Sequence, residues 1–499
     1  MNVIDIQARE RSVERMQGDG SRAPAPSKGR CKVVLYNPRA VFFTMPLALL
    51  AIGSELDPEV YEVVTVDGRL DADAETTLVS HLEGALCLGV TVLTGAPIAD
   101  ALRISRLVKR ARPDLPVIWG GWHPSMFARE CLAEHSVDVT VQGQGEETFA
   151  EIVRRLADGR SLEGCAGCTV RLGDGTICAN PPRELQSIEK FRAHDYGLIP
   201  VERYFALKGK RQLDYISSQG CNFRCAFCSD PFVYGRKWVG LDPTRMALRL
   251  KELWDQYHFD DVNFQDETFF TRRDRVKALA DQIVESGMKI TWAGTMRADQ
   301  GVRLPDDVWA RCKQSGLRRL LVGVESGSDE MLQRIRKDIK IEQVFHTAQK
   351  MRKYGIAGQF PFIVGFPGES DASITATLAC AKRLRAMSPD FQTPFFYFKP
   401  YPGSDIVTEE VARGFRLPDT LEAWSEFDFV DGLPGPWVSR EKFKLIERFK
   451  FFHELAWKQA STGKRLLQQL ARYRCSRDDY RWPIEMALMQ WGKSEPRLS

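Results

Sequence analysis

Three cysteines stand at a spacing that suits an iron–sulfur cluster. Cys221, Cys225 and Cys228 lie in the segment QGCNFRCAFCSDP. Intervals of four and three residues let three thiolates converge on one face of a cuboidal [4Fe–4S] cluster, which keeps one iron open for a further ligand. The alternative is a structural zinc site, which needs a fourth ligand nearby. The next His or Cys is His258, inside a predicted helix, so the spacing favours the cluster.

The triplet follows the first of six apolar runs that alternate with helical patterns. The runs begin at Leu213 and read DYISS, DDVNF, KITWAG, LRRLLVGVE, FPFIVGF and FFYFKP. Six βα units over residues 210–415 predict a partial, open relative of the eightfold barrel, with active residues at the carboxyl ends of the strands.

A second strand–helix series precedes the barrel, over residues 29–159. Five buried strands separated by amphipathic helices predict a doubly wound parallel sheet, whose ligands bind at the strand carboxyl ends. The expected strands are Lys32–Tyr36, Val63–Val66, Leu86–Val92, Pro116–Trp119 and Val137–Val141. The α/β fold class is therefore a doubly wound domain followed by a partial barrel and a C-terminal helical segment.

Three further segments complete the predicted organisation. Residues 1–28 are polar and lack periodicity, which predicts a disordered leader. Residues 160–209 form a connector with a hairpin turning at Gly173-Asp174-Gly175. Residues 416–499 are helical, aromatic and locally basic, and we expect them to pack as amphipathic helices that close over the barrel. An RNA-binding face and a lid over an apolar substrate are the alternatives for this segment.

Composition excludes several classes of protein. The chain has 499 residues, 43% hydrophobic and 27% charged, with a net charge of +4. This near-neutral balance does not suggest a nucleic-acid partner, and no apolar run is long enough for a transmembrane segment. The N-terminus has no secretory signal pattern, so the twelve cysteines predict reduced thiols, a metal site or both, in a cytoplasmic protein. Cys165, Cys168 and Cys178 lack a partner motif and are interpreted as ordinary cysteines.

The motif CNFRCAFC resembles the signature of the radical S-adenosylmethionine (SAM) superfamily. The resemblance implies that the open iron binds SAM, which is cleaved to a 5′-deoxyadenosyl radical. It also implies SAM contacts at successive strand ends. Asp266 or Glu267 would accept from the SAM ammonium, with the choice open because the family's glycine pair is missing, and Arg297 would pair with the carboxylate. The other expected contacts are Phe227 beside the last cysteine, Glu325 and Ser326 at the ribose, and Gly365 at the adenine.

The pattern GG-x-H-P followed by G-x-G-E resembles the cobalamin-binding domain that precedes many radical SAM barrels. The resemblance implies that the benzimidazole tail inserts along the sheet. The expected cobalamin contacts are Thr91, Thr94, Gly120, Gly121, His123, Gly143, Gly145 and Glu146. We expect His123 to be a tail contact and not the cobalt ligand, because the D-x-H-x-x-G motif is absent. The lower face of the corrin would instead meet residues 37–45.

These resemblances imply methylation of an unactivated carbon by an enzyme with three cofactors: a [4Fe–4S] cluster, SAM and cobalamin. A small, apolar or planar substrate and an external electron donor such as flavodoxin or ferredoxin are the expected partners. One rival is a non-methylating radical reaction, such as oxidative cyclisation or ring rearrangement; another is a cobalamin sensor or carrier with an inactive barrel. A tRNA-modifying enzyme is a weaker alternative. Methyl transfer also predicts that the Gly120–Gly121 turn faces the barrel mouth, with cobalt and cluster roughly 10–15 Å apart.

Overall fold

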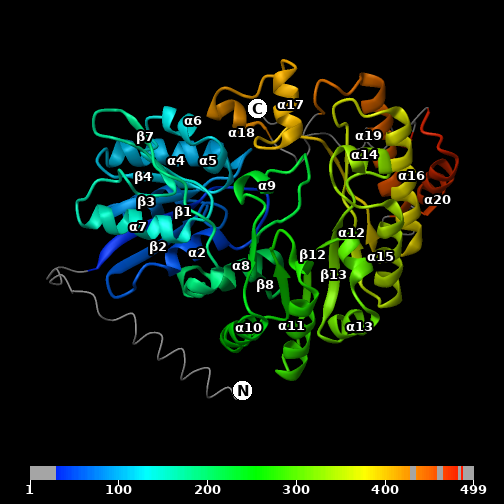
Figure 1. The fold of residues 1–499 in the computed structure, drawn as a ribbon, viewed down its shortest axis with the longest axis horizontal. Helices are drawn as coiled ribbons and strands as arrows, with labels where there is room; N and C mark the ends of the chain where they lie inside the picture. The colour runs from blue at the N-terminus through cyan, green and yellow to red at the C-terminus, as the bar shows by residue number, and fades with distance from the viewer. Residues whose placement is uncertain (1–29, 428–433, 458–464, 482–484, 487–499) are drawn as a thin grey trace.

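Two parallel sheets with flanking helices make up most of the molecule, and they lie side by side (Figure 1). The computed structural model describes residues 30–427, 434–457, 465–481 and 485–486, so the predicted leader lies outside the described residues. No described helix is both long and apolar enough to cross a membrane.

The first sheet has the order β2-β1-β3-β4-β5-β6-β7. Its strands are β1 (Cys31–Asn37), β2 (Tyr61–Asp67), β3 (Ala85–Thr91), β4 (Val117–Gly120), β5 (Val139–Val141), β6 (Cys168–Arg171) and β7 (Ile177–Ala179). Strands β1 to β5 are parallel, which confirms the doubly wound prediction. Its helices are α2 (Leu47–Ser54), α3 (Ala74–Ser80), α4 (Pro97–Ala111), α5 (Trp122–Met126), α6 (Ala128–Ala133) and α7 (Glu146–Ala157).

The predicted hairpin is present, but it belongs to the first sheet. Strands β6 and β7 extend that sheet as an antiparallel edge beyond β5, with the turn between them at residues 172–176. The rest of the connector contains η1 (Ile188–Lys190), η2 (Tyr196–Leu198) and α8 (Val201–Lys208).

The second sheet has the order β16-β14-β13-β12-β11-β8, and β15 pairs with β17 in parallel beside it. The predicted fifth and sixth strands are each divided in two, into β14 and β15 and into β16 and β17. The strands are β8 (Gln212–Tyr215), β11 (Asp261–Phe264), β12 (Thr291–Arg297), β13 (Leu317–Gly323), β14 (Ala357–Gln359), β15 (Phe362–Val364), β16 (Phe391–Gln392) and β17 (Phe395–Tyr397). This arrangement confirms a partial sixfold barrel.

Helices cover the outer face of this barrel (Figure 1). They are α10 (Pro243–Tyr257), α11 (Arg273–Glu285), α12 (Ala298–Arg303), α13 (Asp306–Gln314), α14 (Asp329–Arg334), α15 (Ile341–Lys353) and α16 (Asp371–Met387), with η3 (Phe269–Thr271) before α11. A short hairpin of β9 (Ser218–Gly220) and β10 (Trp238–Gly240), with α9 (Asp230–Val233) between them, was not predicted.

The described C-terminal helices are α17 (Asp405–Ala412), α18 (Leu421–Ser425), α19 (Arg440–Trp457) and α20 (Arg465–Arg477). They do not all cover the barrel. Leu421 and Trp424 of α18 belong to the apolar core of the first domain, and Glu422 forms an ion pair of 2.7 Å with Arg106 of α4. Helix α19 packs instead against the barrel, where Tyr397 donates to Glu447 over 3.0 Å. The described helices of the segment 416–499 thus contact both domains.

Candidate functional site

The three cysteines of the triplet lie on the loop between β9 and α9. All three residues are half-buried. Gly220, directly before Cys221, has φ of +84°, and a Cβ there would come within 2.4 Å of the carbonyl oxygen of Lys237. The loop is anchored on the barrel, because the amide of Ala226 donates to the carbonyl of Ile335 over 2.8 Å. The turn at Gly220 and the hydrogen bond from Ala226 to Ile335 hold the triplet at the mouth of the barrel.

The donor set of this loop fits a cluster better than a single ion. Among the described residues, no three His, Cys, Asp or Glu side chains lie close enough to share one metal ion. A cuboidal cluster spreads its thiolates over three different irons, whereas zinc needs four ligands around one centre. Burial raises the pKa of Cys221 to about 11, so the free thiol is protonated at neutral pH and would lose its proton on binding a cluster.

A cavity of about 380 Å³ lies at the carboxyl ends of the first sheet. We call it the sheet cavity. Its apolar residues come from β3, β4, α2 and α7, among them Val90, Ile118, Leu49 and Phe149. Its lining also includes six of the eight residues expected to contact cobalamin: Thr91, Gly120, Gly121, Gly143, Gly145 and Glu146. The structure therefore brings the predicted glycines together around one cavity.

Sequence reasoning missed the contribution of α2 and of the barrel to this cavity. Leu49 and Ile52 of α2 form part of its apolar wall, and Tyr234 and Gln219 close it from the barrel side. The apolar run of α2 is visible in the sequence, but the sequence does not show that this helix lines a ligand cavity. Gln219 Nε2 donates to Glu146 over 2.7 Å, which connects the sheet cavity to the strand that ends at the cysteine loop.

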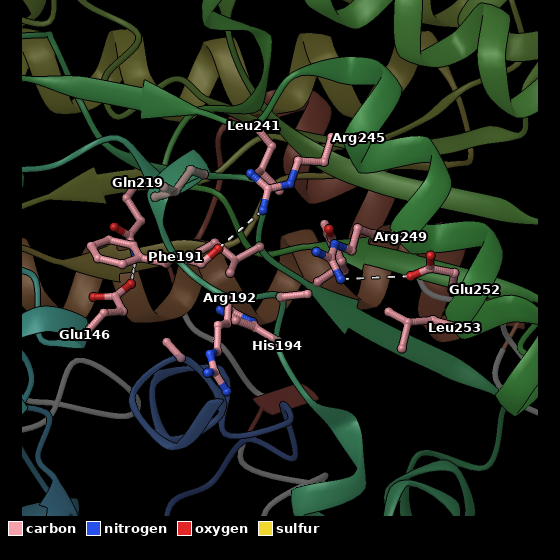
Figure 2. Close-up of a pocket in the computed structure, with 15 residues that line it drawn as sticks. Glu146, Phe191, Arg192, His194, Gln219, Leu241, Arg245, Arg249, Glu252 and Leu253 are labelled. Carbon is pink, nitrogen blue, oxygen red and sulfur yellow. Dashed lines mark hydrogen bonds and ion pairs between the residues drawn. The ribbon is translucent and has the colours of Figure 1, made fainter. Parts of the chain in front are cut away.

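A narrower space of about 90 Å³ continues from the sheet cavity toward α10 (Figure 2). Glu146, His194 and Gln219 line both spaces. Figure 2 shows Arg245 and Arg249 of α10 projecting toward it, with Arg249 paired to Glu252 at 3.9 Å. Because the cysteines do not line it, this space is a side extension of the sheet cavity and not a second reaction centre.

A chamber of about 500 Å³ lies between the two domains. We call it the interdomain chamber. Phe227, Cys228 and Glu325 line it from the barrel, while Thr94 and Met126 line it from the first domain. Leu93 and Trp122 line both this chamber and the sheet cavity. The residues after Gly120–Gly121 therefore face the cysteine loop, as the sequence predicted, and the two ligand spaces meet.

Comparison with protein families assigns both domains. A model of the radical SAM superfamily matches residues 215–381, and a model of the B12 binding domain matches residues 36–153. Residues 215–381 form a radical SAM domain, and residues 36–153 form a B12-binding domain. The chain is a radical SAM enzyme, and its two domains imply a [4Fe–4S] cluster, SAM and cobalamin as cofactors.

Relatives with curated names include methyltransferases and a cyclase. The uncharacterized methyltransferase PH0819 of Pyrococcus horikoshii is 29% identical, over 82% of this chain and 88% of its own length. The anaerobic magnesium-protoporphyrin IX monomethyl ester cyclase of Synechocystis is 25% identical over 71% of each chain. The cytidylyl-2-hydroxyethylphosphonate methyltransferase of Streptomyces wedmorensis is 24% identical over 84% and 89%.

Solved structures share the fold of this radical SAM enzyme. The cobalamin-dependent radical enzyme OxsB with aqua-cobalamin matches with a TM-score of 0.71 and 17% identity, covering 90% of this chain and 71% of OxsB. The methyltransferase TsrM from Kitasatospora setae, bound to tryptophan and a SAM analogue, matches with a TM-score of 0.66 and 19% identity, covering 78% and 77%. At these identities the likeness concerns the fold.

The radical SAM barrel separates the two carboxyl groups that the sequence left as alternatives. Asp266 is 1% exposed and accepts from the amide of Ser217 over 2.8 Å and from its hydroxyl over 2.6 Å. It holds the connection between β8 and β9, so its predicted contact with the SAM ammonium is not supported. Glu267 lines the sheet cavity, where the hydroxyl of Tyr234 lies 3.4 Å from Oε1 and Oε2 is buried without a partner.

Two other residues that were predicted to contact SAM form hydrogen bonds within the protein. Ser326 is fully buried, and its hydroxyl lies 3.1 Å from that of Thr377. The amide of Gly365 donates to Glu369 over 2.7 Å, and its carbonyl accepts from Trp437 over 2.5 Å. Neither Ser326 nor Gly365 lines the interdomain chamber. The Ser326 hydroxyl and the Gly365 backbone groups are bonded to neighbouring elements of the barrel instead.

Arg297 and Glu325 lie beside the cysteine loop. Arg297 pairs with Asp299 at 3.0 Å, its guanidinium lies 3.8 Å from the centre of the Phe223 ring, and Nη1 lies 3.7 Å from Cys225 Sγ. Its predicted pairing with the SAM carboxylate would have to compete with these contacts. Glu325 has φ of +67° and pairs with Lys337 at 2.8 Å while lining the chamber. Glu325 thus stays a candidate for the ribose.

His123 of the B12-binding domain is turned away from the sheet cavity. Its ring is fully buried, with centroids 5.2 Å from Phe127 and 5.5 Å from Trp424 of α18. Nδ1 lies 3.2 Å from the hydroxyl of Thr94, and burial lowers the pKa of His123 to about 4. The predicted contact of His123 with the cobalamin tail is therefore not supported, and Thr94 reaches the interdomain chamber instead of the sheet cavity.

We expect substitution of His123 to leave the cobalt environment unchanged. The His123→Ala variant should lower the thermal midpoint, because it removes a buried ring from an aromatic cluster. Its paramagnetic resonance spectrum in the cob(II)alamin form should match that of the wild type and show no nitrogen splitting from the protein. A nitrogen triplet that disappears in the variant would show that this histidine reaches the cobalt.

Glu267 should make stability depend on pH. Burial raises the pKa of Glu267 from 4.5 to about 8. Between these two pH values the carboxyl group is protonated in the folded protein and ionised in the unfolded chain. The free energy of unfolding therefore falls as pH rises from about 4.5 to 8, by at most about 1.4 kcal/mol per pH unit.

The Glu267→Gln variant should remove this dependence. In thermal unfolding of the cofactor-free protein, we expect the variant and the wild type to have similar midpoints at pH 5. At pH 8.5 the variant should be the more stable. Glu163→Gln, at an exposed position, is the matched control and should follow the wild type at both pH values. Parallel pH profiles for Glu267→Gln and wild type would contradict the prediction.

Proposed function

We propose that this enzyme methylates an unactivated carbon of a small molecule, using the cluster and SAM for radical formation and cobalamin as the methyl carrier. The observation that carries the proposal is the junction of the two ligand spaces. Leu93 and Trp122 line both the sheet cavity and the interdomain chamber, and Phe227 and Cys228 line the chamber from the other side. A methyl carrier held in the sheet cavity would thus be next to a substrate that lies against the cysteine loop.

The chain's own residues would position the cofactors and exclude water. In this proposal Cys221, Cys225 and Cys228 hold the cluster, and Phe227 and Glu325 contact SAM in the chamber. Six residues that line the sheet cavity would bind cobalamin: Thr91, Gly120, Gly121, Gly143, Gly145 and Glu146. An external electron donor of the flavodoxin or ferredoxin class would reduce the cluster. A cytoplasmic location belongs to the proposal, because cluster thiols need a reducing compartment.

A non-methylating reaction is the second candidate, and it is favoured by the similarity to the magnesium-protoporphyrin ester cyclase. Mass spectrometry separates the two. The enzyme is reconstituted anaerobically with iron, sulfide and cobalamin and then given SAM with a trideuterated methyl group. Methylation yields 5′-deoxyadenosine, S-adenosylhomocysteine and a product that carries the label. A product without the label, formed with 5′-deoxyadenosine, would establish the second candidate. A reconstituted enzyme that does not cleave SAM would favour a cobalamin sensor or carrier.

A further inference from the structure

The cysteine triplet has an outer side as well as a side that faces the interdomain chamber. Cys228 lines the chamber, whereas Cys225 does not. The Sγ of Cys225 lies 3.7 Å from Nη1 of Arg297, and Nη2 of that arginine donates to the carbonyl of Lys337. The next residue, Asp338, is exposed. The thiol of Cys225 is therefore connected to the outer surface of the protein through a single guanidinium.

Exposed cations surround this outer side of the cysteine loop. They come from the loop itself, from the two residues before β10 and from residues 334–340 at and after the end of α14. The three segments are in contact, because the amide of Ala226 donates to the carbonyl of Ile335 and the backbone of Lys237 packs against Gly220. We define the basic surface by six exposed residues: Arg224, Arg236, Lys237, Arg334, Arg336 and Lys340.

Arg236 acts on the same exposed carboxylate as Arg224, although it comes from the segment after α9. Asp338 accepts from Nε of Arg224 over 2.8 Å. That hydrogen bond lowers the pKa of the carboxyl group, and the charges of Arg224, Arg297 and Arg236 lower this pKa further. Two cations of the basic surface and the buried guanidinium beside Cys225 thus lie around one carboxylate.

The cations of the basic surface outnumber the carboxylates that lie among them. Asp338 pairs with Arg224 at 2.8 Å, and Asp405 pairs with Arg336 at 2.5 Å. Asp329 accepts from a backbone amide over 3.0 Å. Within the part of the chain that the structure describes, the other four cations form no ion pair. The surface therefore keeps an excess of positive charge that an acidic partner can neutralise.

We infer that the basic surface docks an acidic one-electron carrier protein, which reduces the cluster from its outer side. This inference rests on the proposed function and names the docking site of its electron donor. The carrier loses one electron and the cluster gains it, and no bond or proton is transferred. Such a partner suits this surface because complementary charges speed and orient the encounter, and because redox partners need only small interfaces. A carrier bound here would leave both ligand spaces open, since none of the six residues lines either of them.

The affinity for an acidic flavodoxin tests the surface in the enzyme loaded with cluster, cobalamin and SAM. The wild type should bind this flavodoxin at low salt and lose affinity as added salt screens the charges. The double variant Arg236→Glu with Lys237→Glu should weaken binding by about tenfold or more. Neither side chain has an ion-pair partner among the described residues, so the double variant leaves no carboxylate unpaired.

The double variant Arg110→Glu with Lys289→Glu is the matched control, because it changes the net charge by the same amount. Both residues are exposed, Arg110 near the end of α4 and Lys289 before the amino end of β12, which is opposite to the barrel mouth. The control should bind flavodoxin as the wild type does. Absent binding by the wild type, or equal binding by all three proteins, would overturn the inference.

The rate at which the cluster bleaches separates docking from damage to the cluster. With reduced flavodoxin, the variant of Arg236 and Lys237 should bleach about tenfold or more slowly than the wild type. With photoreduced deazariboflavin, a small neutral reductant, all three proteins should bleach alike. Slow bleaching of the variant with both reductants would mean a damaged cysteine loop and overturn the inference. If no protein bleaches with either reductant, the proposed function fails and the affinity alone decides the docking site.

Nucleic acid is the other polyanion that a basic surface attracts. The connection to Cys225 favours the electron carrier, and a third measurement compares the two. Total tRNA is titrated into the same three proteins under the same salt conditions. We expect the variant of Arg236 and Lys237 to lose flavodoxin binding. Loss of tRNA affinity with unchanged flavodoxin affinity would assign the basic surface to nucleic acid and overturn the inference.

Discussion

Replacing Cys221, Cys225 and Cys228 together by alanine should abolish both the iron–sulfur cluster and the cleavage of SAM. The anaerobic wild-type enzyme should hold about four irons per chain and show a broad charge-transfer absorption that bleaches with dithionite. The triple variant should have neither the iron nor the absorption. The expected effect is complete because the three thiols assigned to the cluster all lie on this one loop, between β9 and α9.

A second triple variant provides the control for the number of thiols removed. Cys165, Cys168 and Cys178 lie at the edge of the first sheet, and Cys168 Sγ lies 3.2 Å from the carbonyl of Cys165. Their replacement by alanine should leave the iron content and the SAM cleavage of the enzyme unchanged. A cluster that survives loss of the first triplet and disappears with the second would reverse the assignment.

The sequence predicts the edge of each sheet at which functional residues gather, but not the direction of each side chain. Alternating strands and helices predict where strands end, and this places the glycines at 120, 121, 143 and 145, and Glu325, at strand ends; the triplet is predicted by its own spacing. Ser326 follows Glu325 directly and is nonetheless fully buried against α16. The backbone of Glu325 has φ of +67°, and such a local turn redirects the following side chains in a way that strand alternation does not reveal.

Contacts between distant segments account for the other differences. His123 has the sequence context of a ligand, yet Trp424, which lies about 300 residues later, packs on its ring. Nothing local in either segment predicts that pairing. The hairpin of β6 and β7 was predicted from its turn residues, but its addition to the edge of the first sheet depends on pairing with β5. Local patterns specify the elements, whereas tertiary packing decides which faces remain open to ligands.

Filling the sheet cavity from Gly120 should abolish cobalamin binding while the protein stays folded. Gly120 ends β4 at the cavity, and the nearest atom to a Cβ built there is Val141 Cβ at 3.7 Å. Its φ is not positive, so a larger residue meets no backbone strain. In the Gly120→Leu variant the added side chain would occupy space that the cobalamin tail needs, because closely packed groups cannot overlap.

We expect the affinity for cobalamin to fall at least about 100-fold, which corresponds to roughly 2.7 kcal/mol. Titration with hydroxocobalamin, followed by absorbance, measures it. Gly173→Leu is the matched control, because Gly173 lies in the hairpin turn with no atom within 4 Å of a Cβ. Gly120→Leu should also keep its cluster and still cleave SAM, since the cysteine loop lies on the other side of the interdomain chamber. Its methyl transfer should be lost. Unchanged cobalamin affinity would mean that the tail enters the domain elsewhere, and the junction at Leu93 and Trp122 would then no longer support methyl transfer.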